Sequence, residues 1–137
     1  PMKWRGAYVS SKFALEGLTQ TLRLEMQDTP IHVSLIQPGP ITSDIRKNSI
    51  PHFEKWIDWR GSARAEQYET SLLKRLYESR GPDRFELPAD AVTKKLAHAL
   101  EAPKPRLNYY VTRPTYMMAA LRRILPARLF EGVVGKG

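Results

Sequence analysis

The hydrophobic pattern near the start of the chain predicts a long helix from about Gly6 to Asp28, ended by Pro30. Its large apolar residues recur at spacings of three and four, which places them on one face: Leu15, Leu18, Leu22 and Met26. Small residues form a second face, where another helix could approach closely: Ala14, Gly17 and Thr21. The helix therefore offers two faces for packing.

An alternation of side chains follows, and it predicts a strand from Ile31 to Gln37. A second strand is predicted from Leu107 to Thr112, in a tyrosine-rich segment. A helix, a short turn, an apolar strand and a Pro-Gly loop make half of a βαβ unit, which implies a parallel sheet. The sequence therefore predicts an α/β fold.

Further segments along the chain are predicted to be helical. Residues 66–80 predict an amphipathic helix, while the region of Trp56 and Trp59 is predicted to be helical or turn-like. Residues 87–103 predict another helix, with Asp90 in its first turn, where a carboxylate suits the helix dipole. Residues 114–137 predict an amphipathic helix interrupted at Pro126.

Composition narrows the possible classes. A chain of 137 residues with 42% hydrophobic residues suits one domain with a packed core. It has no cysteine, which excludes disulfides and cysteine nucleophiles and is compatible with the cytoplasm, the compartment that we expect. The three histidines show no metal-ligand spacing, so no metal site is predicted. No apolar run approaches the ~18 residues that cross a bilayer.

The net charge of +8 could attract nucleic acid, a membrane surface or an anionic small molecule. The positive charges are dispersed and no nucleic-acid motif is visible, so we expect no nucleic acid partner. In the tail, Arg122, Arg123 and Arg128 lie beside apolar residues. Such a segment either lies on a membrane surface or packs on its own protein or a twin subunit.

Tyr8 and Lys12 lie four residues apart, so they share one face of the predicted helix. A phenol with an ordinary pKa near 10 exchanges protons poorly at neutral pH. A cation ~4 Å away, at an effective dielectric of about 20, favours the phenolate by up to ~4 kcal/mol. The pair could therefore act as a general acid/base, or it could be a solvated pair without function.

The context favours the first interpretation. The stretch AYVSSKFALEGLTQTLRLEM, followed by a strand and then PGPITSD, resembles the short-chain dehydrogenase/reductase family. Tyr8 and Lys12 match its Y-x-x-x-K motif, and Pro38 and Gly39 match its Pro-Gly motif after the strand. The resemblance covers essentially the whole chain and implies a doubly wound parallel sheet of Rossmann type.

The resemblance also implies roles for single residues. Tyr8 would exchange a proton with the substrate oxygen, and Lys12 would support it and bind the ribose of NAD or NADP. Pro38 and Gly39 would close one side of the nicotinamide pocket, and the backbone of Ile41 would hold the carboxamide. The family's usual threonine five residues after the motif proline is replaced by Ser43. Thr42 lies beside it, so either hydroxyl could contact the cofactor.

Residues 43–87 occupy the place of the family's variable substrate lid. Four aromatic residues there could line an apolar pocket or belong to an ordinary core: Phe53, Trp56, Trp59 and Tyr68. The resemblance implies a bulky apolar alcohol or ketone as substrate. It also implies a homo-oligomer, in which the long helix packs against its twin.

The sequence departs from the family's pattern upstream of Tyr8. Only PMKWRGA precedes this residue, and the chain contains no GxGxxG-like turn for the pyrophosphate. We therefore expect residues 1–137 to be the C-terminal portion of a single Rossmann-type domain, inactive by itself. The alternative is a non-catalytic remnant or interaction domain with the same fold.

Overall fold

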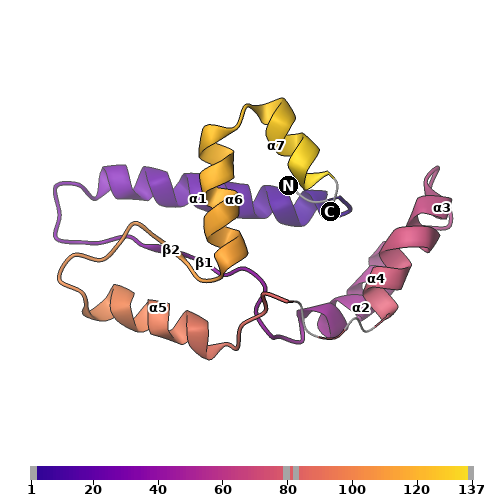
Figure 1. Ribbon diagram of the computed structural model, residues 1–137, viewed down its shortest axis with the longest axis horizontal. Coiled ribbons are helices and arrows are strands. Elements are labelled where there is room, and N and C mark those ends of the chain that lie inside the picture. Colours follow the sequence, from indigo (N-terminus) through magenta and orange to yellow (C-terminus); the bar gives the residue numbers. More distant parts are fainter. Residues whose placement is uncertain (1–2, 79–80, 82–83, 136–137) are drawn as a thin grey trace.

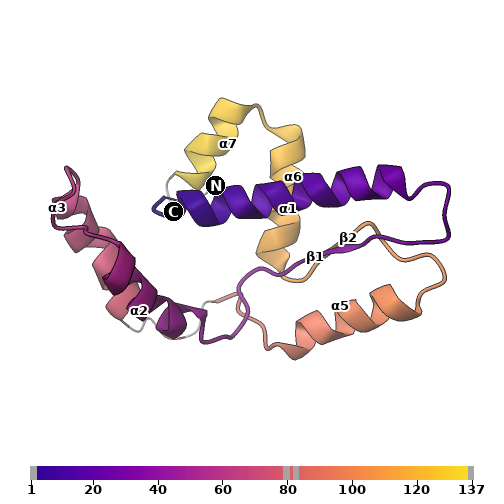
Figure 2. The same cartoon turned by 180° about the vertical axis from the view of Figure 1, so that it is seen from behind.

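The computed structural model describes residues 3–78, 81 and 84–135. Its elements follow one another in this order: α1 (Gly6–Glu25), β1 (Leu35–Gln37), α2 (Ile45–Trp56), α3 (Ala65–Gln67), η1 (Tyr68–Leu73), α4 (Lys74–Tyr77), α5 (Asp90–Glu101), β2 (Asn108–Tyr110), α6 (Arg113–Ile124) and α7 (Ala127–Val134). The strands lie between α1 and α5, and α6 crosses α1, as the views from the two sides agree (Figures 1 and 2).

β1 and β2 pair in parallel, with Leu35 opposite Asn108 and Gln37 opposite Tyr110. Parallel strands need a crossover connection, and here it contains the helices from α2 to α5. The prediction of an α/β fold with a parallel sheet is thus confirmed.

Both strands are shorter than predicted. Ordered pairing begins where the Leu35 N–H donates to the Leu107 carbonyl, and residues 31–34 lie outside β1. Side chains from elsewhere bind this segment instead, since Arg23 Nε donates to the Val33 carbonyl at 2.9 Å. Continuing the register would place Pro105 opposite His32, and proline has no N–H to donate to a strand neighbour. The predicted strand is therefore wrong over its first half.

The predicted helix over residues 66–80 is helical as far as Tyr77, but η1 at its centre is a π-helix. Residues 79 and 80 lie outside the described residues. Thr70 Oγ1 donates to the Glu66 carbonyl at 2.8 Å, and Ser71 Oγ donates to the Gln67 carbonyl at 2.6 Å. In a π-turn the N–H that bonds a carbonyl comes from the fifth residue along the chain instead of the fourth. The hydroxyls of Thr70 and Ser71 give the carbonyls of Glu66 and Gln67 a hydrogen bond at this point.

α1 ends at Glu25, three residues before the predicted end. Its one buried residue is Thr19, and Arg23 on the same side donates to the carbonyls of Val33 and Leu107. The large leucines of the predicted stripe are exposed, with Leu18 at 66%. Within this chain, α1 thus contacts the strands through a polar side and leaves its leucine face uncovered.

The tail is divided at Pro126 into α6 and α7, as predicted. Phe130 is buried, whereas Ile124 and Leu129 are exposed. Within the described ranges, no helix is long and apolar enough to cross a membrane. Peripheral membrane contact through the tail stays a prediction, as does the cytoplasmic compartment.

The chain is open rather than compact. It exposes 10877 Å² of surface, whereas a compact monomer of its mass exposes about 7,300 Å². The buried apolar residues of the described chain are Tyr109, Val111 and Phe130, two of them at the second strand. Large apolar surfaces on α1, α2 and α6 consequently face solvent.

Candidate active site

Tyr8 and Lys12 lie on the first turns of α1. Their spacing stacks the two side chains on one face of the helix, and Lys12 Nζ lies 5.5 Å from the centroid of the Tyr8 ring. Tyr8 is 51% exposed, so its hydroxyl can be reached by another molecule. Ser11 Oγ donates to the Tyr8 carbonyl at 2.7 Å within the same turn. The structure therefore brings the predicted catalytic pair together.

The ammonium group lies over the ring rather than at the hydroxyl. Cation–π contacts of this kind contribute about 0.5–1 kcal/mol at exposed sites. They also hold a positive charge beside the ring of Tyr8. The arrangement can support proton exchange at Tyr8 without occupying its oxygen.

Pro38 and Gly39 follow β1 directly. A Cβ added at Gly39 would clash with the hydroxyl oxygens of Thr112 and Thr115. Thr112 is fully buried at the start of α6, and its Oγ1 is 2.8 Å from Thr115 Oγ1. Gly39 is thus required because the loop after β1 approaches α6 too closely for a side chain.

Ile41 forms an isolated parallel bridge with Leu87. In this bridge the Leu87 N–H donates to the Pro40 carbonyl at 3.1 Å, and the Thr42 N–H donates to the Leu87 carbonyl at 3.0 Å. The neighbours of Ile41 make these bonds, so its own N–H and C=O point to the other side. In the described part of the chain no hydrogen bond uses either group. Ile41 therefore presents one backbone donor and one backbone acceptor.

The hydroxyls of Thr42 and Ser43 differ in their partners. Thr42 Oγ1 lies 3.5 Å from the Leu87 carbonyl, at the long limit of a hydrogen bond. Among the described residues, no hydrogen bond to Ser43 Oγ is present, and this side chain is exposed. Ser43 is consequently the freer of the two hydroxyls.

The structure brings only part of the predicted aromatic set together. The rings of Phe53 and Tyr68 have centroids 6.4 Å apart, which joins α2 to η1. Trp56 is 69% exposed beside Lys55, and Trp59 stacks with Arg60 in the loop after α2. Within the described chain, neither tryptophan has a ring contact with this pair.

Trp4 completes the aromatic group and was missed in the sequence. Its ring centroid lies 4.8 Å from that of Tyr68, so η1 contacts the segment just before α1. Trp4 has a φ of 65°, a left-handed conformation that bulky residues rarely adopt. No hydrophobic periodicity includes Trp4, and the only sign in the sequence that it lies near the site is its position four residues before Tyr8.

Within the described residues, no group of three His, Asp or Glu side chains lies close enough to hold a metal ion. Two separate segments instead offer polar groups: α1 offers a phenol with a neighbouring ammonium group, and the loop after β1 offers an unpaired backbone donor and acceptor. These groups suit proton exchange and the binding of an amide.

Known proteins are similar to this chain over most of its length. A family model described as short chain dehydrogenase matches residues 1–53, a span that includes both the Tyr8–Lys12 pair and the loop from Pro38 to Ser43. The chain is 34% identical over 131 residues to the uncharacterized oxidoreductase YbbO of Escherichia coli, covering 95% of this chain and 42% of YbbO. The chain belongs to the short-chain dehydrogenase/reductase family.

Two further relatives extend the comparison within the family. The NADPH-dependent 3-dehydrocapnine reductase of Ornithobacterium rhinotracheale is 30% identical, with 96% of this chain and 44% of the relative covered. Estradiol 17-beta-dehydrogenase 2 of Mus musculus is 25% identical, with 100% of this chain and 37% of the relative covered. The chain thus spans less than half the length of these relatives.

Proposed function

We propose that the intact protein containing this chain is an NAD(P)-dependent oxidoreductase that interconverts an alcohol and a ketone or aldehyde by hydride transfer. The observation that carries the proposal is the placement of Lys12 Nζ 5.5 Å from the Tyr8 ring, inside the segment matched by the family model. Relatives named as oxidoreductases and as an NADPH-dependent reductase support it.

The loop after β1 has the shape and polarity to receive a nicotinamide. The absence of a side chain at Gly39 lets the loop lie close against Thr112 and Thr115 of the α6 start. The free N–H and C=O of Ile41 match the acceptor and donor of a carboxamide. When bound, the cofactor donates or accepts the hydride. NAD and NADP both remain in the proposal.

Tyr8 is proposed to exchange the proton at the substrate oxygen. In the direction of reduction, its hydroxyl gives a proton to the oxygen that gains negative charge. Lys12 stabilises the phenolate that remains, because a cation close to an anion lowers its energy. In the direction of oxidation the same groups act in reverse order.

The substrate is proposed to be bulky and apolar. Trp4, Phe53 and Tyr68 form a continuous aromatic group between the start of α1 and the lid. Aromatic rings supply large apolar contact areas. A relative named for estradiol, which is a bulky apolar alcohol, supports this substrate class.

The experiment compares Tyr8→Phe with wild type in the intact protein. Oxidation of NADH and of NADPH is followed with a panel of steroid ketones and long-chain aldehydes. We expect Tyr8→Phe to reduce kcat by at least about 100-fold, in line with the usual contribution of general acid/base catalysis. Tyr116→Phe is the matched control, because Tyr116 lies on α6 and packs edge-on against Tyr110.

Two outcomes would overturn the proposal in different ways. Wild-type turnover in Tyr8→Phe would mean that another group moves the proton. No turnover of any carbonyl by wild type, with no binding of either cofactor by calorimetry, would favour a non-catalytic remnant or interaction domain with this fold. The large exposed surface of the chain is the observation that supports this second candidate function.

A further inference from the structure

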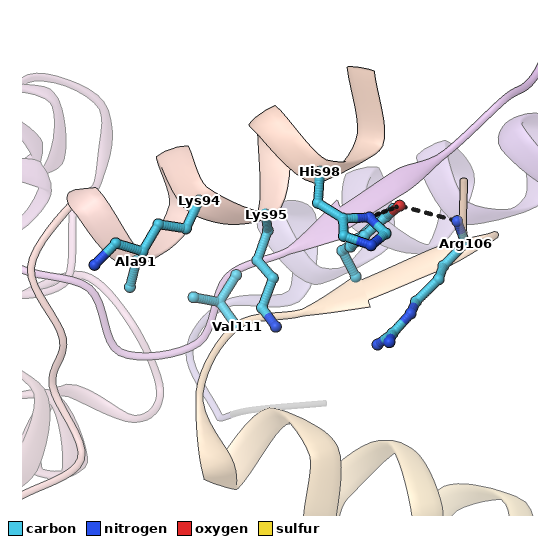
Figure 3. A pocket seen from close by; sticks show the side chains of 7 residues that line it. Ala91, Lys94, Lys95, His98, Arg106 and Val111 are labelled. Carbon is cyan, nitrogen blue, oxygen red and sulfur yellow. Dashed lines mark hydrogen bonds between the residues drawn. The ribbon is translucent and has the colours of Figure 1, made fainter. Parts of the chain in front are cut away.

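A cavity of about 320 Å³ lies between α5 and β2, away from the Tyr8–Lys12 pair. Figure 3 shows its side chains, which come from one face of α5 and from the edge of β2 with the loop before it. Its polar lining consists of Lys94, Lys95, His98, Arg106 and Tyr109. No acidic residue lines it, so its charge is strongly positive.

Tyr109 organises the cavity from within. It is only 3% exposed, and its Oη accepts a hydrogen bond of 2.9 Å from the backbone N–H of Arg106. The same Oη lies 2.9 Å from His98 Nδ1, with the two rings edge to face. These bonds hold the imidazole of His98 and the backbone of Arg106 in place around a buried oxygen.

The hydroxyl of Tyr109 can donate to Nδ1 of His98 or accept from it, depending on the His98 tautomer. In the tautomer in which Oη donates, the other ring nitrogen, Nε2, carries the imidazole proton and can donate to a ligand. Figure 3 shows this second nitrogen on the side of the ring toward which Lys95 and Arg106 extend.

The two lysines on α5 have different environments. Lys94 forms an ion pair of 2.8 Å with Asp90, and this hydrogen bond raises the pKa of Lys94 above its ordinary value. Lys95 is half-buried and extends past Val111 toward the same side as Arg106 (Figure 3). Within the described residues, no carboxylate forms an ion pair with Lys95 or Arg106.

We propose that this cavity binds a phosphate group through Lys95, Arg106 and His98. A cluster of basic side chains with no carboxylate in its lining attracts an anion. A guanidinium group matches two phosphate oxygens with parallel N–H bonds, and a lysine adds a mobile point charge. His98 supplies a third donor whose orientation Tyr109 holds. The site is independent of the proposed oxidoreductase activity, because none of its residues belongs to the Tyr8 region.

The test is calorimetric titration of the intact protein with inorganic phosphate, at an ionic strength kept constant with sodium chloride. We expect saturable binding that weakens by at least about tenfold in Lys95→Gln and in Arg106→Gln, since each variant loses a charge-assisted hydrogen bond. Arg106→Gln keeps the backbone N–H that binds Tyr109. Lys104→Gln is the matched control, because it removes a nearby exposed charge that does not line the cavity.

A second arm separates a soluble phosphate compound from a lipid headgroup. Sedimentation with vesicles of phosphatidylcholine containing phosphatidic acid is compared with sedimentation with phosphatidylcholine alone. Vesicle binding that Lys95→Gln abolishes assigns the site to a headgroup, and phosphate binding without vesicle binding assigns it to a soluble ligand. The proposal is overturned if wild type shows no saturable phosphate binding, or if Lys104→Gln weakens it as much as Lys95→Gln does.

Discussion

Gly39 lies directly against the buried hydroxyl of Thr112, so that the loop after β1 is held by the first residues of α6. Each residue lies just past the C-terminal end of one strand, Gly39 after β1 and Thr112 after β2, and the two ends are adjacent because the strands are parallel. Because Ile41 follows two residues later, this contact also sets the direction of the backbone groups proposed to bind a carboxamide.

We predict that Gly39→Ala destabilises the intact protein by about 1–3 kcal/mol, because the added methyl group overpacks a site with a fully buried neighbour. Urea unfolding measures this change. Gly17→Ala is the matched control, since nothing lies within 4 Å of a Cβ added there and alanine is the better helix former by up to about 1 kcal/mol. A neutral Gly39→Ala would show that the loop and α6 separate in solution.

The aromatic group at the lid leads to a prediction about substrate binding. Tyr68→Ala removes the ring that contacts both Trp4 and Phe53, so we expect KM for a bulky apolar substrate to rise by about tenfold or more, given the stacking energies of aromatic pairs and the lost apolar area. The effect on kcat should be small. Steady-state kinetics measure both constants.

Trp56→Ala is the control for Tyr68→Ala, because Trp56 is exposed. Within the described residues, the one ring contact of Trp56 is with the ammonium group of Lys55. Equal KM changes in the two variants would contradict the assignment of the substrate to the Trp4–Tyr68 side.

A further prediction concerns pH and the contact between α2 and α4. Tyr77 Oη donates to Glu54 Oε1 at 2.8 Å, and this hydrogen bond raises the pKa of the Tyr77 phenol above its ordinary value of 10.0. A raised pKa in the folded state means that the contact stabilises the fold fully below about pH 10 and is lost as pH rises through the raised value. The side chain is half exposed, so the contribution is at most about 1 kcal/mol.

Urea unfolding of wild type and Tyr77→Phe between pH 7 and pH 11 measures this contribution. The difference between the two proteins should be constant up to about pH 9 and should shrink above pH 10. Tyr116→Phe controls for the loss of an exposed phenol. A difference that grows at high pH would have the wrong sign for a bond that needs the neutral phenol.

Self-association is our remaining proposal, and it rests on the exposed leucine face of α1. Leu18 is 66% exposed, with Leu15 and Leu22 beside it on the same face. We predict that the intact protein forms a homo-oligomer at micromolar concentration and that Leu18→Glu shifts it toward the monomer, because a charge cannot be buried unpaired. Light scattering measures the mass. An unchanged oligomer in Leu18→Glu would place the interface elsewhere.

Local chemistry was readable from the sequence. Tyr8 and Lys12 share a face because the helical period brings residues four apart together, whatever else the chain does. The break at Pro126 and the acidic first turn of α5 follow from single residues as well. The parallel pairing of the strands was predictable too, since a strand followed by a long helical crossover has few other solutions.

Contacts between distant segments were decided only by the tertiary structure. Whether a residue of the predicted first strand pairs depends on its neighbour. If the register continued, Pro105 would have no N–H to donate to the Ile31 carbonyl. Trp4 joins Tyr68 through a left-handed backbone that no periodicity signals. The apolar pattern of α1 predicts a packing face but not the surface that covers it, and here the strands meet its polar side instead. Local periodicity specifies an element, whereas the contacts that complete a site depend on chain segments far apart in sequence.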